Sequence, residues 1–178
     1  MSDPIRIDLP LTRQKARSLR AGQVVELFGV MYTARDAAHK RLIDLIETGA
    51  ELPVDLADIT IYYVGPSPAA PGAVIGSAGP TSSYRMDPYA PTLIARGQTG
   101  MIGKGPRGPE VLDAMCEHGA VYFAAVGGAA AFIAQSIKSY EVVAYEDLGA
   151  EALARITVEA FPCIVAQDSR GGDLYKQQ

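Results

Sequence analysis

Two nearby segments combine glycines, hydroxyl groups and cations, the residue types from which a small-anion site is built. Residues 76–89 contain Thr81, Ser82 and Ser83 followed by Arg85, and residues 100–105 contain Lys104. Glycine lets a backbone approach a ligand closely, and arginine offers a planar fork of donors that suits a carboxylate or a phosphate. This chemistry indicates a small anion held against a loop.

The same residues also have ordinary structural explanations. Thr81, Ser82 and Ser83 would form a turn whose hydroxyls bond to nearby backbone, and no Ser-His-Asp set can be assembled from the sequence. Lys104 would be a solvated lysine at a turn. The residue pattern favours neither this role nor contact with a bound anion. Residues 103–108, Gly-Lys-Gly-Pro-Arg-Gly, match the spelling of a dinucleotide-binding loop. We discount that match because Pro106 removes a backbone donor and no acidic residue follows at the required spacing.

The composition predicts a folded chain and gives no sign of a nucleic-acid partner. The 178 residues are 48% hydrophobic and carry a formal net charge of −4, so the chain can bury a substantial core. Its cations are scattered among acids and form no basic stripe of the kind that follows a phosphodiester backbone. No signal peptide is visible, and the longest apolar run, residues 120–134, is short of the roughly 20 residues that cross a bilayer. We expect a cytoplasmic protein without a membrane partner.

The metal-ligating residue types are few and far apart. Cys116 and Cys163 belong to no paired metal or redox spacing, which favours reduced thiols. His39 and His118 lie near neither a cysteine nor a second histidine, so we expect no metal site made by this chain alone. His118 is explained by a helix carboxyl terminus, and His39 by a structural or partner-contact role.

Strand-like and helix-like hydrophobic patterns alternate along the chain. Arg35 lies between a predicted strand and a predicted helix, where unpaired backbone N–H groups attract anions. The pattern predicts an α/β sandwich around one mixed sheet, with residues 1–178 as a single domain. Expected strands are residues 5–9, 23–30, 59–64, 74–75, 101–102, 121–126, 141–145 and 164–166, and expected helices are 13–19, 36–48, 88–96, 109–118 and 129–138.

Five segments together carry a family resemblance. They are residues 32–40, YTARDAAHK; 76–81, GSAGPT; 85–89, RMDPY; 101–105, MIGKG; and 143–149, VAYEDLG. In these segments the chain resembles the β subunit, or C-terminal-type domain, of class I iron–sulfur-dependent fumarate hydratases and L-tartrate dehydratases. The likeness extends over almost the whole chain. It implies a swivelling β/β/α layered domain, and this chain resembles the members in which that domain is a separate small subunit.

The resemblance also implies how the catalytic parts are divided. A partner α subunit would hold a [4Fe–4S] cluster through three cysteines, and this chain would bind no metal. Arg35, Arg85 and Lys104 match residues that hold substrate carboxylates, and Thr81 matches the residue that handles the proton on the neighbouring carbon. Ser82 and Ser83 would line the pocket. Tyr84 departs from the small residue usual at its position, which bears on pocket shape or on the interface.

Three functions follow as hypotheses. The first is a hydro-lyase β subunit that interconverts fumarate and (S)-malate and is active only with its α partner. The second is an L-tartrate dehydratase β subunit that forms oxaloacetate from tartrate, and the sequence does not separate these two four-carbon dianions. The third is a non-catalytic anion-binding scaffold, which the joint presence of Arg35, Thr81, Arg85 and Lys104 disfavours.

Overall fold

A mixed sheet organises the chain in the computed structural model, which describes residues 3–125 and 130–176. Seven strands follow the order β1-β2-β3-β4-β5-β7-β6 over these residues. The pairings from β1 to β5 are parallel, and β7 is antiparallel to each of its neighbours. The strands are β1 Ile5–Asp8, β2 Val24–Thr33, β3 Thr60–Tyr62, β4 Gly100–Gly103, β5 Val121–Ala125, β6 Ile137–Ala144 and β7 Leu153–Gln167.

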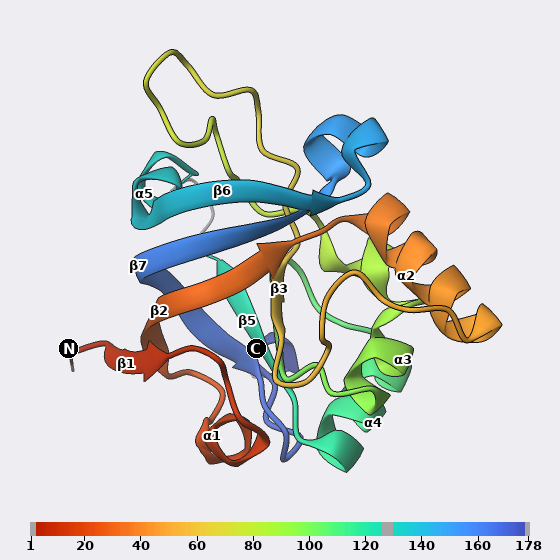
Figure 1. Ribbon diagram of the computed structural model, residues 1–178. Helices are drawn as coiled ribbons and strands as arrows, with labels where there is room; N and C mark the ends of the chain where they lie inside the picture. The colour runs from red at the N-terminus through yellow and green to blue at the C-terminus, as the bar shows by residue number, and fades with distance from the viewer. Residues whose placement is uncertain (1–2, 126–129, 177–178) are drawn as a thin grey trace.

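The long strand β7 closes part of this sheet into a ring. One of its edges pairs with β2 over nearly its whole length. Its other edge pairs first with β6 and then, beyond residue 162, with β5. Strands β2, β3, β4, β5 and β7 therefore form a closed circuit, and β6 crosses beside the first half of β7 (Figure 1).

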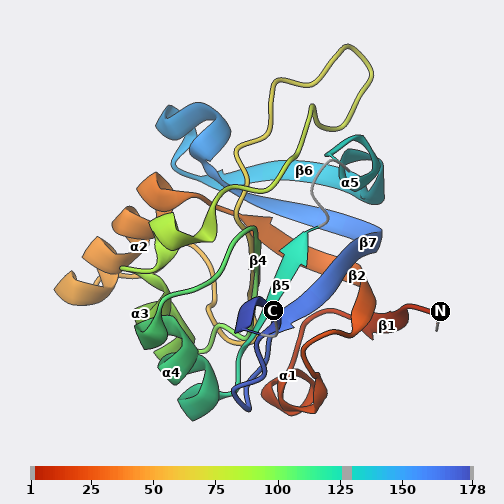
Figure 2. The ribbon, with the colours of Figure 1, turned by 180° about the vertical axis from the view of Figure 1, so that it is seen from behind.

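Helices α2, α3 and α4 lie together on one side of the strands in both views (Figures 1 and 2). The helices are α1 Arg13–Ser18, α2 Asp36–Thr48, α3 Ala90–Ala95, α4 Pro109–His118 and α5 Ala130–Ser136, with 3-10 turns η1 Ser83–Met86, η2 Glu146–Glu151 and η3 Leu174–Lys176. No helix within the described residues has the length and apolar character needed to cross a membrane.

Successive side chains of the central strands point alternately into two separate hydrophobic cores. Tyr62 packs among strand residues inside the ring, where its ring meets Phe161 of β7 edge-on at 5.1 Å. Its neighbours Ile61 and Tyr63 face the helices instead. All three residues of β3 are buried, as in parallel strands that are covered on both faces. Two β layers and one helical layer confirm the expected α/β layered domain around a mixed sheet.

Several helix boundaries confirm the local sequence signals. Thr12 caps α1, since its hydroxyl accepts the backbone N–H of Lys15 at 3.2 Å. Gly49 ends α2 in the left-handed conformation with φ of 70°. The fourth helix begins at Pro109 and ends at His118, as predicted. Proline at the first helical position and a glycine just beyond the end explain why this helix was predictable.

The prediction for the last strand was wrong in extent, since only residues 164–166 of β7 were expected. Two irregularities hid the rest of it. Opposite Phe28, Glu159 and Ala160 form a bulge, where the register moves from Leu27 and Phe161 to Gly29 and Val158, and Ala160 has φ of 55°. Pro162 follows, at the point where the other edge of β7 passes from β6 to β5. A proline is tolerated there because its missing N–H breaks no pairing that the described strands make.

Other boundaries also differ from the prediction. Helix α5 ends at Ser136, short of the expected residue 138, because Ile137 already pairs with Val158 as the first residue of β6. Val74 and Ile75 form no strand, although Ile75 is buried in the ring core. The expected strand end at Val126, the Gly127-Gly128 turn and the helix start at Ala129 lie outside the described residues.

Candidate active site

The predicted site residues follow parallel strands at the edge where those strands end. Arg35 comes two residues after β2, and Lys104 comes directly after β4. Strands β2, β3 and β4 are mutually parallel, so their carboxyl ends meet at one edge of the sheet. Ligands of open parallel sheets bind at such edges.

The segment with Thr81 and Ser82 extends this edge. The backbone N–H of Thr81 donates to the Tyr63 carbonyl at 2.7 Å, and the N–H of Lys104 donates to the Thr81 carbonyl at 3.3 Å. The N–H of Ser83 then donates to the Lys104 carbonyl at 2.9 Å. Ser82 and Lys104 thus form a parallel bridge. Residues 81–83 continue the sheet beyond β3 and β4, and their backbone lies beside Lys104.

Arg35 occupies the junction between β2 and α2, as the sequence predicted. The side chain passes over Gly65, where a Cβ would lie 3.0 Å from the arginine Cδ. Its Nε lies 3.3 Å from Glu151 Oε1 and 3.8 Å from Asp36 Oδ1, and the side chain keeps 25% of its exposure. Two carboxylates therefore hold this guanidinium at the end of η2. Gly65 lies two residues after Tyr63, and the Tyr63 carbonyl accepts the N–H of Thr81. Residues 63–65 and Thr81 therefore connect Arg35 to Lys104.

Arg85 and Lys104 are two exposed cations of this part of the fold. Arg85 lies on η1, directly after the segment that pairs with Lys104. Neither cation forms an ion pair within the described part of the chain. Tyr84, directly before Arg85 in the sequence, is 66% exposed. We call Arg35, Thr81, Ser82, Arg85 and Lys104 the cation rim.

Ser83 does not belong to the rim, so the expectation that it lines the pocket was wrong. Its side chain is fully buried, and its Oγ lies 2.7 Å from the Tyr122 hydroxyl. The Tyr122 hydroxyl donates to the Gly105 carbonyl at 2.8 Å, which leaves Ser83 as the donor to Tyr122. A Cβ at position 103 would overlap the Ser83 hydroxyl, so Gly103 provides the space for this bond. Ser83 therefore links η1, which carries Arg85, to Tyr122 of β5.

Arg107 is a polar residue near the site that the sequence pattern did not single out. It lies in the glycine-rich stretch after β4, yet its side chain is fully buried. Its Nε donates to Asp87 Oδ1 at 2.8 Å, and its Cζ lies 5.1 Å from the Tyr63 ring and 5.0 Å from the Tyr122 ring. The sequence signal that could have found the pair is that Asp87 and Arg107 lie within or next to the two segments predicted to bind an anion. We call Tyr63, Ser83, Asp87, Arg107 and Tyr122 the supporting layer.

His39 lies beside the supporting layer and is neutral. It is buried, and burial lowers its pKa from 6.5 to about 4. Its Nδ1 lies 2.8 Å from the Arg35 carbonyl, and its ring meets the Tyr63 ring edge-on at 5.4 Å. Burial likewise raises the pKa of Tyr63, so that hydroxyl stays protonated. The structural role predicted for His39 agrees with these contacts.

The side chains of this chain do not fit an iron–sulfur cluster. Within the described residues, no three side chains of His, Cys, Asp or Glu are grouped to hold a metal ion. Cys163 is buried in the ring core, whereas Cys116 is exposed on α4. A [4Fe–4S] cluster requires several cysteine thiolates at one place. The two cysteines of this chain lie in different parts of the fold and do not form such a group.

Comparison with known proteins agrees with the motifs along the chain. The family described as "Fumarase C-terminus" matches residues 1–178. The anaerobic class I fumarate hydratase of Escherichia coli K12 is 43% identical over 155 residues, which cover 86% of this chain and 28% of that protein. Fumarate hydratase 2 of Leishmania major is 36% identical, covering 97% of this chain and 32% of that protein. The chain thus spans about a third or less of these fumarate hydratases.

One relative is nearly the same length as this chain. The putative L(+)-tartrate dehydratase subunit beta of Methanocaldococcus jannaschii is 37% identical over 173 residues, which cover 94% of this chain and 89% of that protein. The chain therefore aligns with part of the longer relatives and with almost all of the shorter one.

Proposed function

Because this chain belongs to the fumarase C-terminus family, a family of hydro-lyases, we propose that it is the β subunit of an iron–sulfur hydro-lyase that interconverts fumarate and (S)-malate. Residues 1–178 would act as one domain in this assembly. The observation that carries the proposal is the cation rim, in which Thr81, Ser82 and Lys104 share backbone pairings at the sheet edge where Arg35 lies.

The chemistry of the rim suits a dicarboxylate. Adding water to fumarate builds negative charge on one carboxylate while the other must be held in place. Arg85 and Lys104 have no counter-ion within the described chain, so both are available to the two ends of a dianion. Fixed cations stabilise developing charge most when water is excluded, and we propose that a partner subunit closes over the rim.

Arg35 and Thr81 would have separate tasks in this pocket. Glu151 and Asp36 lie near the Nε of Arg35, at 3.3 Å and 3.8 Å, and its two terminal nitrogens would bind a substrate carboxylate. The Thr81 hydroxyl would handle the proton on the carbon next to that carboxylate, and Ser82 would bind substrate beside it. A hydroxyl is a weak base, and its use here depends on the surrounding positive charge.

The cluster belongs to a partner in this proposal. Among the described residues, no side chains are grouped as a metal site. About two thirds or more of the length of the longer relatives lies outside the part that matches this chain. We propose that an α subunit carries the [4Fe–4S] cluster and that the complete pocket lies between the two chains. The role of this chain is then to bind and orient the substrate.

Tartrate dehydration to oxaloacetate is the second candidate activity. The relative whose length matches this chain is named as a putative tartrate dehydratase subunit beta, which favours a separate subunit of that kind. Tartrate and malate differ by one hydroxyl group, and the rim cations serve either dianion. Assays of the assembled complex with malate, fumarate and tartrate decide between the two. A scaffold without catalytic function would turn over none of them.

The test is Arg85→Ala in the complex with its cluster-bearing partner, purified without oxygen. Loss of this cation should lower kcat/KM for the dicarboxylate by about 100- to 1,000-fold, with the complex still assembled. Arg96→Ala is the matched control, since Arg96 is an exposed arginine at the carboxyl end of α3 and outside the rim. Equal activity of Arg85→Ala and the wild type would reject the catalytic role of the rim.

A further inference from the structure

Arg107 and Asp87 form a largely buried ion pair beside the cation rim, in which the Asp87 side chain is 21% exposed. The Arg107 side chain has no exposed surface, and its Nε lies 2.8 Å from Asp87 Oδ1. The other carboxylate oxygen, Oδ2, accepts the backbone N–H of Gly108 at 2.8 Å. One carboxylate therefore holds both a side chain and the backbone of the segment after β4.

The ion pair connects the segments that carry two rim cations. Asp87 lies two residues after Arg85 and caps η1, and Arg107 lies three residues after Lys104. Both intervals are too short for the cation and its anchor to move independently. The bond between Asp87 and Arg107 therefore acts together with the backbone pairings of Thr81 and Ser83 with Lys104 to fix the two segments relative to each other.

A second link joins the same two segments. Tyr122 of β5 accepts the Ser83 hydroxyl at 2.7 Å and donates to the Gly105 carbonyl at 2.8 Å. Ser83 begins the turn that carries Arg85, and Gly105 follows Lys104. Both links therefore join η1 to the segment after β4 through buried or partly buried groups.

The surroundings of position 107 require the shape of arginine as well as its charge. The guanidinium lies about equally far from the rings of Tyr63 and Tyr122, and its Nη1 donates to the Met101 sulfur at 3.2 Å. Lysine has a compact ammonium group and no planar fork, so it cannot reproduce these directions. A buried ion pair contributes little net stability compared with apolar residues of similar volume, and its best attested use is to fix one arrangement.

We propose that Arg107 and Asp87 are positioning residues that set the spacing of Arg85 and Lys104, and thereby the length of dicarboxylate that the rim accepts. The inference rests on the proposed function of the rim. Neither residue touches the substrate in this arrangement. Their effect reaches it only through the two exposed cations.

Arg107→Lys in the assembled complex tests the proposal. The variant keeps the positive charge but should lower kcat/KM for the four-carbon substrate by up to about 100-fold, the loss expected when binding groups are displaced by an ångström. It should also reduce the preference for a four-carbon over a five-carbon dicarboxylate, measured by competitive inhibition with glutarate and succinate. A purely stabilising role would leave that preference unchanged in folded protein.

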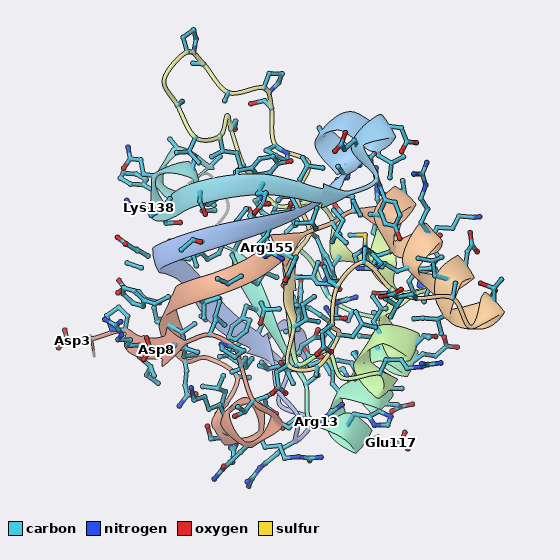
Figure 3. All side chains as sticks on the ribbon, viewed as in Figure 1. Asp3, Asp8, Arg13, Glu117, Lys138 and Arg155 are labelled. Carbon is cyan, nitrogen blue, oxygen red and sulfur yellow. The ribbon has the colours of Figure 1, made fainter. Side chains whose placement is uncertain are left out.

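Arg6→Lys is the matched control for this substitution. Arg6 also pairs with an aspartate, Nε to Asp8 Oδ1 at 3.1 Å, and its Cζ lies 3.9 Å from the Phe28 ring. The pair is exposed on β1, where Figure 3 labels Asp8, on the other side of the strands from α2, α3 and α4. We expect Arg6→Lys to keep the activity and the chain-length preference of the wild type. Unchanged activity and preference in folded Arg107→Lys would overturn the proposal.

Hydrogen exchange separates this inference from the proposed function. In the full chain alone, Arg107→Lys should speed exchange at the amides of Ser83 and Gly108 by about tenfold, while the amides of β2 stay protected. If the wild-type complex has no activity but exchange increases, the proposed function fails and the link between the segments stands. If exchange stays the same, the positioning role is rejected whatever the activity. Asp87→Asn supplies a second variant if Arg107→Lys does not fold.

Discussion

The cation rim and the supporting layer beneath it use similar residue types in opposite ways. In the rim, Arg85 and Lys104 are exposed and have no counter-ion among the described residues. In the supporting layer, the Arg107 side chain is fully buried and bonded to Asp87, and its Cζ lies 5.1 Å from the Tyr63 ring and 5.0 Å from the Tyr122 ring. An arginine that meets solvent is available to a ligand. An arginine that is buried and paired with a carboxylate of the fold is not available to a ligand.

This comparison separates chemistry from stability. Removing an exposed cation leaves the packing intact, so its loss should appear in activity. Removing a partner from the buried pair leaves an uncompensated charge, so its loss should appear in folding as well. Arg35 is intermediate, because Glu151 and Asp36 hold it while a quarter of its side chain stays exposed.

Asp87→Ala should give the largest loss of stability. Arg107 would remain buried without its carboxylate, which costs about 3–5 kcal/mol in the free energy of unfolding. Arg85→Ala, two residues away in the sequence, should change that free energy by no more than about 0.5 kcal/mol. Urea unfolding of the two variants measures the contrast. If both variants unfold at the same urea concentration as the wild type, the division into rim and supporting layer is wrong.

His39 should make the fold sensitive to acid. The unfolded chain binds a proton at this residue below pH 6.5, whereas the folded chain does so only near pH 4. Stability from this group is therefore complete above pH 6.5 and falls by about 3 kcal/mol as the pH decreases to 4. His39→Gln lacks this titration. Its free energy of unfolding, compared with that of the wild type across the same pH range, should show a shallower decline, and parallel curves would contradict the buried neutral histidine.

Two glycines of one loop should respond differently to alanine. A Cβ at position 103 would overlap the Ser83 hydroxyl, and we expect Gly103→Ala to cost about 1–3 kcal/mol and to displace the rim. At Gly105 a Cβ would meet nothing within 4 Å, so Gly105→Ala should cost only the strain of its φ of 82°, about 1 kcal/mol. Thermal unfolding compares the two variants. A larger loss at Gly105 would show that the space beside Ser83 is not limiting.

Local signals explain which parts of the fold were predictable. Helix α4 was predicted to the residue because Pro109 and Gly119 mark its ends, and α2 because Gly49 stops it. Strand β3 was predictable because its β-branched and aromatic run is buried on both faces. The extent of β7 was not predictable, since its bulge at Glu159 and Ala160 is stabilised by pairing with β2, far away in sequence.

The candidate site divides in the same way. Residue types suggested a small-anion site but left Thr81 and Lys104 open to ordinary turn roles, and only the family resemblance grouped Arg35, Thr81, Arg85 and Lys104 as one predicted site. The position of Ser83 could not be read from its type, because a serine in a turn has the same sequence signal whether it faces solvent or Tyr122.

The amino-acid sequence by itself determined the family motifs and the ends of α2 and α4, since each depends on residue type or on neighbours a few positions away. Only the tertiary structure decided that Asp87 meets Arg107, that Ser83 meets Tyr122 and that β7 closes the ring. These contacts join residues 15 or more positions apart. Their geometry follows from the packing of strands and loops against each other, which local preferences do not specify.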